Sequence, residues 1–152
     1  MNTLLRFGAV ILLLATGACS REGPSTNGDW TFVNYWAEWC RPCIKEIPEL
    51  NALNARDGFR VHGVNFDGAS GEALSRQIDA LGVEFPTLSE DPGPRFGLER
   101  PQVLPTTLVL RPDGSLLRVL VGPQTADSLI AATRNSAATA ADSGPESGNK
   151  QR

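Results

Sequence analysis

Strand-like and helix-like segments alternate along the middle of the chain, and this order restricts the fold more than any other feature. The segment 31–36, TFVNYW, is β-branched and aromatic on both faces, as in a strand buried inside a sheet. Apolar residues then recur near helical spacing over 43–55, with Pro48 as an expected kink. A second strand over 59–66 and a second amphipathic helix over 69–82 follow. Alternation of this kind is typical of βαβ units, so we predict an α/β protein with a parallel sheet and helices on its faces.

The later part of the sequence predicts an antiparallel hairpin and a closing helix. The strand-like segments 106–110 and 115–121 flank the turn RPDG. A third helix is predicted over 125–134, and we expect the RFGL segment, 95–98, to be a short helical connector. We therefore predict a central mixed β-sheet of about four to five strands, flanked by helices on both faces.

Composition limits the number of domains and the kinds of partner. The chain has 152 residues and a formal net charge of -3, without a basic run, which excludes the electrostatic footprint of a nucleic-acid binder. One domain over 29–135 has a normal size, and we expect it to be a monomer. Residues 136–152 are small, polar and low in complexity, which predicts a disordered tail.

The first residues have the pattern of a bacterial export signal. Arg6 precedes an apolar run that is shorter than the roughly 20 residues needed to cross a bilayer as a helix. We predict a signal peptide over 1–18, followed by a flexible tether over 19–28 that is rich in Gly, Ser and Pro.

Cys19 is a candidate lipidation site. The sequence TGAC resembles the lipobox of bacterial lipoproteins, with Thr16 where that family usually has Leu. The resemblance implies a lipidated Cys19 that anchors the chain in a membrane of the periplasm. Ser20 at the next position favours the outer membrane over the inner one. Cleavage by the ordinary signal peptidase, which would remove Cys19 or leave it as a free thiol, stays open.

Two of the three cysteines lie where the first strand gives way to the first helix. A sulfur at this place is near the positive end of the helix dipole, which favours thiolate over thiol, so Cys40 is the predicted nucleophile. Cys43 lies one turn further along and is close enough to resolve a mixed disulfide formed by Cys40. Pro42 restrains the turn between the sulfurs, and Arg41 adds positive charge beside the thiolate.

Other interpretations of the Cys-X-X-Cys pattern are weaker. A structural zinc site normally takes four ligands, and the mature chain offers only Cys40, Cys43 and the distant His62. We therefore expect no metal, and we interpret His62 as a structural residue of the second strand. A purely structural disulfide would close a very short loop and would constrain little of the unfolded chain.

The segment VNYWAEWCRPCIKEIP resembles the active-site segment of the thioredoxin-like, exported TlpA/ResA-type thiol-disulfide oxidoreductases. The resemblance implies a thioredoxin fold, with Trp39 beside the redox cysteines and Pro48 as the proline that kinks the helix. Asn34 stands where thioredoxin has a buried Asp, and Asn cannot take a proton. Glu46 matches a glutamate of the ResA-like members. It is a candidate acid–base group for Cys43, with an ordinary solvated glutamate as the alternative.

A second segment, VLPTTLVL, resembles the part of the family in which a cis-proline faces the disulfide. The matching residue is Pro105. The resemblance implies that its neighbours Leu104 and Thr106 border the substrate groove, together with Trp39 and the residues between the cysteines. By contrast, we expect the segment 67–68 to form only a turn.

The resemblance implies a protein-disulfide reductase of the cell envelope that uses the Cys40–Cys43 dithiol and no further cofactor. Its partners would be protein thiols and disulfides, and a membrane electron donor of the DsbD/CcdA kind. Two alternatives stay open at this point. One is an oxidase that donates its disulfide to folding proteins, and the other is a tethered thioredoxin-like module that binds a partner and senses redox state.

Overall fold

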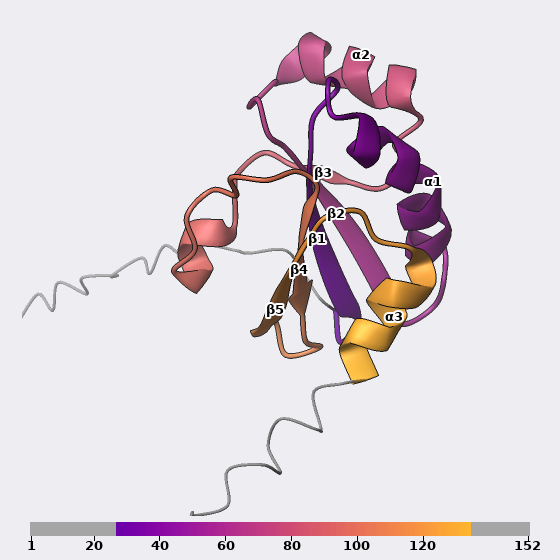
Figure 1. Ribbon diagram of the computed structural model, residues 1–152, viewed down its shortest axis with the longest axis vertical. Coiled ribbons are helices and arrows are strands. Elements are labelled where there is room, and N and C mark those ends of the chain that lie inside the picture. Colours follow the sequence, from indigo (N-terminus) through magenta and orange to yellow (C-terminus); the bar gives the residue numbers. More distant parts are fainter. Residues whose placement is uncertain (1–26, 135–152) are drawn as a thin grey trace, which may run out of the picture.

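The computed structural model describes residues 27–134, and its centre is a five-stranded mixed sheet (Figure 1). The strands lie in the order β3-β2-β1-β4-β5, with β1 parallel to β2, β2 parallel to β3, and β4 antiparallel to both β1 and β5. The strands are β1 (Trp30–Trp36), β2 (Phe59–Asn65), β3 (Thr87–Leu88), β4 (Thr106–Leu110) and β5 (Leu116–Val121). This arrangement confirms the predicted thioredoxin fold and its mixed sheet.

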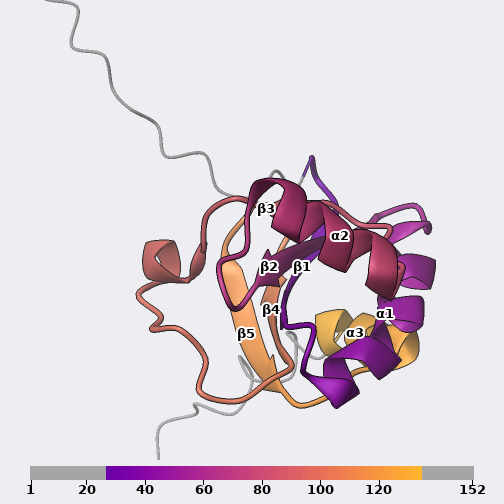
Figure 2. The same cartoon turned by 90° about the horizontal axis from the view of Figure 1, so that it is seen from above.

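Three α-helices cover one face of the sheet (Figure 2). They are α1 (Arg41–Asn54), α2 (Gly71–Leu81) and α3 (Ala126–Arg134). The crossovers β1-α1-β2 and β2-α2-β3 step across the sheet in the same direction, and right-handed crossovers in one direction place their helices on the same face. The opposite face carries the single-turn 3₁₀ helix η1 (Gly93–Phe96) and its flanking segments. Both faces are therefore covered, but only one of them by α-helices.

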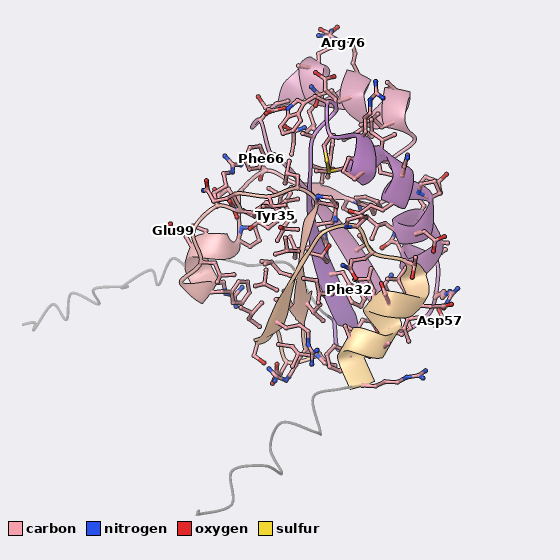
Figure 3. All side chains as sticks on the ribbon, in the orientation of Figure 1. Phe32, Tyr35, Asp57, Phe66, Arg76 and Glu99 are labelled. Carbon is pink, nitrogen blue, oxygen red and sulfur yellow. A yellow bond between two sulfur atoms is a disulfide. The ribbon has the colours of Figure 1, made fainter. Side chains whose placement is uncertain are left out.

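The central strand β1 is buried on both faces, as its composition predicts. Phe32 packs in the main core between the sheet and the helices, whereas Val33 and Tyr35 pack against the η1 side (Figure 3). The core on the helix side includes side chains of α1 and α3 such as Leu50 and Leu129. The carboxyl end of β1, which the cysteines follow, therefore lies in the buried middle of the molecule.

The ends of the elements follow from local chemistry. α1 begins two residues before the predicted start, because Cys40 is its N-cap and a proline at the beginning of a helix gives up no hydrogen bond. α2 ends at Gly82, which has a φ of 65° and forms a left-handed C-cap. The RFGL segment contributes to η1, as expected. Only β3 was not predicted, since a two-residue strand has no periodicity to detect.

The predicted signal peptide over 1–18, the lipidation site Cys19 and the predicted tail over 136–152 lie outside the described residues. Within residues 27–134, no helix combines the length and the apolar character that crossing a membrane requires.

Candidate active site

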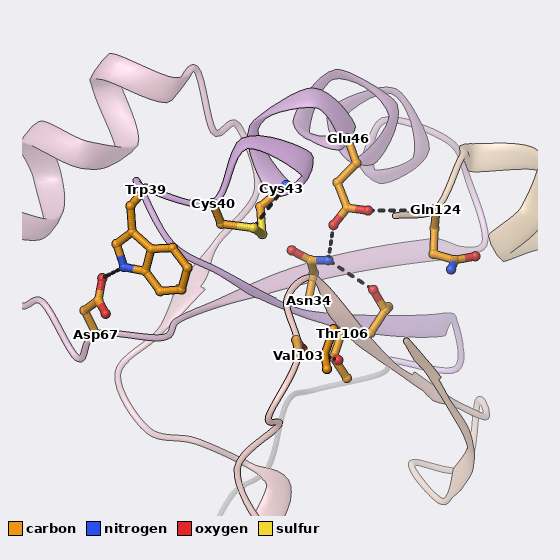
Figure 4. Close-up of a disulfide and its surroundings, with 10 residues drawn as sticks. Asn34, Trp39, Cys40, Cys43, Glu46, Asp67, Val103, Thr106 and Gln124 are labelled. Atoms are coloured by element: carbon orange, nitrogen blue, oxygen red, sulfur yellow. Dashed lines mark hydrogen bonds between the residues drawn. A yellow bond between two sulfur atoms is a disulfide. The ribbon is translucent and has the colours of Figure 1, made fainter. Parts of the chain in front are cut away.

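Cys40 and Cys43 form a disulfide at the first turn of α1 (Figure 4). Their Cα atoms are 5.3 Å apart. The backbone N–H of Cys43 donates a hydrogen bond to Cys40 Sγ at 3.3 Å, so this sulfur caps the helix. A thiolate at this position would be stabilised by the same N–H group and by the helix dipole. Cys40 is 4 % exposed and Cys43 is 1 % exposed, so both cysteines are buried in the disulfide form.

The disulfide belongs to a small apolar cluster at the carboxyl end of β1. Buried Trp36 and Ala37 pack in the same cluster as the two cysteines, and Leu104 is packed against it. The peptide bond between Leu104 and Pro105 is cis, which confirms the conformation implied by the family resemblance. The segment that ends in Pro105 is therefore close to the redox pair in space, although it is distant from the cysteines in the sequence.

Among the predicted groove residues, Pro105 and Thr106 are buried, and the Thr106 side chain points inward. Thr106 is 2 % exposed, and its hydroxyl donates to the backbone carbonyl of Val103 at 2.7 Å. Any contact between Thr106 and a partner is thus left to its backbone. Arg41 and Pro42, in contrast, are exposed on the first turn of α1.

Trp39 is 61 % exposed and is held by neighbours from the end of β2. Its indole Nε1 donates to Asp67 Oδ2 at 2.8 Å, and its ring lies edge-on to Phe66 with 6.3 Å between ring centroids. The guanidinium of Arg100 lies 5.1 Å from the centre of the Phe66 ring. The expectation that Asp67 serves only a turn is wrong, since it also orients Trp39. Asp67 follows a strand that is parallel to β1, so it lies at the same edge of the sheet as the cysteines. Its position in the sequence could therefore have identified Asp67 as a residue of the site.

Glu46 is buried, with 3 % of its surface exposed, which excludes the alternative of an ordinary solvated glutamate. Its Oε1 accepts a hydrogen bond from Asn34 Nδ2 at 2.6 Å, and its Oε2 accepts one from the backbone N–H of Gln124 at 2.8 Å. Burial raises the pKa of Glu46 above its ordinary value of 4.5, and the two hydrogen bonds offset part of this effect. The amide of Asn34 also donates to Thr107 Oγ1 at 3.0 Å (Figure 4).

Gln124 and Thr107 were not predicted as parts of the site. Gln124 contributes through its backbone, which carries no side-chain signal in the sequence. His62 pairs in register with Val33, whose side chain packs on the η1 side of the sheet, so the strand pleat turns His62 away from α1. Within the described part of the chain, no three His, Cys, Asp or Glu side chains gather as a set of metal ligands.

A mixed sheet with this strand order, and with a Cys-X-X-Cys pair capping the helix after its central strand, defines the thioredoxin-like class of proteins. Comparison with known families narrows the class. The sequence model of the AhpC/TSA family matches residues 18–119, and the chain belongs to that family.

Individual relatives agree with the resemblance to ResA-type proteins. The chain is 34% identical over 112 residues to the thiol:disulfide interchange protein HelX of Rhodobacter capsulatus, covering 70% of this chain and 62% of HelX. It is 31% identical over 107 residues to the thiol-disulfide oxidoreductase ResA of Bacillus subtilis, covering 68% of this chain and 58% of that protein. The chain thus spans about 60% of the length of these curated relatives. The crystal structure of StoA from Bacillus subtilis superimposes with a TM-score of 0.56 at 25% identity, covering 70% of this chain and 84% of StoA.

Proposed function

We propose that this protein is a thiol-disulfide oxidoreductase that reduces disulfides of other proteins through Cys40 and Cys43. The observation that carries the proposal is the disulfide itself, which joins a sulfur capping a helix to a second, more buried sulfur one turn away. The names of the relatives HelX and ResA support this reaction type.

The reaction would proceed in two exchange steps. In the reduced protein, the Cys40 thiolate attacks a disulfide of the substrate and forms a mixed disulfide, while one substrate sulfur leaves as a thiol after taking up a proton. Cys43 then loses its proton and attacks Cys40, which releases the second substrate sulfur and forms the Cys40–Cys43 disulfide. Two electrons pass to the substrate, and a dithiol electron donor must return them.

Glu46 is the proposed acid–base group for Cys43. It follows Cys43 by one helical turn, and burial raises its pKa above the ordinary value, which favours uptake of a proton by this carboxyl group. Its two hydrogen bonds fix the carboxylate in place, which suits a proton acceptor that serves a single buried thiol.

The surface around Cys40 is the proposed recognition site for protein substrates. Trp39, Arg41 and Pro42 are exposed on one side of the disulfide. Leu104 and cis-Pro105 approach it from the other side, with the backbone of Thr106 next to them. An extended substrate segment can lie between these two sides and present its disulfide to Cys40.

The proposed location is the bacterial periplasm, with the chain anchored through a lipid on Cys19 and reduced by a membrane donor of the DsbD/CcdA kind. Export is supported by the signal-like first 18 residues and the TGAC sequence. The outer membrane is favoured by Ser20. Labelling with a radioactive fatty acid tests the anchor, since Cys19→Ser should abolish incorporation of the label.

The reduction potential decides between a reductase and the other two possibilities. The full chain carrying Cys19→Ser would be equilibrated with dithiothreitol or glutathione buffers, and its free thiols counted. A value near that of thioredoxin, about -270 mV, supports the reductase, and a value near that of DsbA, about -120 mV, supports an oxidase.

Two variants complete this experiment. Cys43→Ser should trap mixed disulfides with protein substrates, whereas Cys40→Ser should trap none. Absence of a reversible Cys40–Cys43 couple would remove the enzymatic function and leave a binding module.

A further inference from the structure

The side-chain amide of Asn34, in the centre of the buried site, makes only part of the hydrogen bonds that it could make. It is 1 % exposed, and its Nδ2 donates one hydrogen bond to Glu46 Oε1 and one to Thr107 Oγ1. Both hydrogens of the amide are therefore in use. The carbonyl oxygen Oδ1 is buried and accepts no hydrogen bond in the described structure. A buried acceptor without a donor is unfavourable, so this oxygen calls for an explanation.

The orientation of the Asn34 amide explains the unpaired oxygen. In Figure 4, Asn34 Oδ1 points toward the disulfide, while Nδ2 points toward Glu46. The amide cannot turn round while Glu46 is ionised, because the carboxylate accepts hydrogen bonds and would then face a second acceptor.

The disulfide form contains no donor for Asn34 Oδ1, because neither sulfur carries a hydrogen. Reduction changes this situation. Cys43 then gains an S–H group at a position that is only 1 % exposed, where water cannot readily serve as its acceptor. The dithiol form thus creates a buried donor on the side of the site toward which the orphan oxygen points.

We propose that Asn34 is a positioning residue whose amide bridges the resolving thiol and its acid–base group, with Oδ1 accepting a hydrogen bond from the Cys43 S–H and Nδ2 holding the Glu46 carboxylate. This inference rests on the proposed function in assigning a role to the dithiol form.

The bridge acts at both ends of the reaction. A dithiol donor that reduces the protein supplies two electrons and two protons. The proton on Cys43 forms the S–H group that donates a hydrogen bond to Asn34 Oδ1. When the mixed disulfide on Cys40 is resolved, the Cys43 S–H turns from Asn34 Oδ1 to the Glu46 carboxylate. Glu46 takes up the proton as the Cys43 sulfur attacks Cys40, and the substrate sulfur leaves as a thiolate. Glu46 is the only charged residue among the buried polar residues of the described chain, so no other buried charge competes for the proton.

The inference predicts a shift of the thiol-disulfide equilibrium. Asn34→Leu removes a hydrogen bond that exists only in the dithiol form and an orphan acceptor that exists only in the disulfide form. The contact with Glu46 is present in both forms, so its loss largely cancels. The exchange constant of the full chain with dithiothreitol, measured with Cys19→Ser, should therefore move toward the disulfide by roughly two- to fivefold. Asn34→Ala should move it in the same direction.

Thr107→Val is the matched control, because it removes the other contact of the amide and leaves Oδ1 in place. Its exchange constant should stay at the parent value even if the variant is less stable. A merely structural Asn34 would lower the stability of all three variants and leave all three exchange constants unchanged. That result would overturn the proposal.

A spectroscopic measurement addresses the hydrogen bond directly. In the chain with Cys19→Ser and Cys40→Ser, the only thiol is Cys43, and its S–H stretching band should lie at lower frequency than in the same chain with Asn34→Leu. An unmoved band contradicts the bridge. Neither measurement needs a protein substrate. If the chain fails to reduce protein disulfides while the band and the exchange constant shift as expected, only the proposed function is lost.

Discussion

Gly63 lies in the middle of β2, next to Asn34 of β1, and has no room for a side chain. A Cβ atom at this position would lie 2.6 Å from Trp36 Nε1, 3.0 Å from Thr87 Oγ1 and 3.1 Å from Phe85. The nearest of these atoms belongs to a completely buried indole ring, which has no space to retreat into. Overpacking of this kind costs about 1–3 kcal/mol, so Gly63→Ala should lower the free energy of unfolding by that amount.

Urea unfolding followed by circular dichroism measures the effect. A double-mutant cycle identifies its cause. Trp36→Phe removes the indole nitrogen that the new Cβ meets, so Gly63→Ala should cost less in the Trp36→Phe background than in the parent. Two results would refute the reasoning: a Gly63→Ala protein within about 0.5 kcal/mol of the parent, or an equal cost in both backgrounds. Because Trp36 packs with Cys40 and Cys43, the same substitution should also perturb the redox pair.

Three further predictions concern the site and its support. The pKa of Glu46 is raised in the folded state, so its protonation stabilises the folded protein fully below pH 4.5, and this contribution is lost as the pH rises through the folded pKa. Glu46→Gln should therefore abolish this pH dependence of the free energy of unfolding in urea. Parallel pH profiles of variant and parent would contradict the assignment. Tyr35→Phe removes the 2.5 Å hydrogen bond to Asp91 Oδ1 and should cost about 1–3 kcal/mol, with faster amide exchange around η1, whereas unchanged exchange rates argue against this link. Asp67→Ala frees the indole of Trp39 at the surface and should change the unfolding free energy by less than about 0.5 kcal/mol. It should raise KM for a protein disulfide but leave the dithiothreitol exchange constant unchanged, and an unchanged KM would exclude Trp39 orientation from recognition.

Much of the fold could be predicted because its signals are local. β1 is recognisable because every residue of 31–36 except Asn34 is β-branched or aromatic, and α1 is recognisable from the spacing of apolar side chains after it. The same order puts Cys40 at the start of a helix, which already indicates its chemistry. The cis conformation at Pro105 is not a local signal, and only the family resemblance indicated it.

The sequence by itself thus determined the order of the elements and the position of the cysteine pair, since periodicity and helix capping depend on neighbouring residues. Only the tertiary structure decided the state of Glu46. Its carboxylate accepts hydrogen bonds from Asn34 in β1 and from the backbone N–H of Gln124, which is 78 residues away in the sequence. Likewise, β3 exists only through its pairing with β2, and Asp67 reaches Trp39 across 28 residues. The electrostatic environment of a side chain is set by whichever segments the fold brings around it, and contacts of that range leave no periodic pattern in the chain.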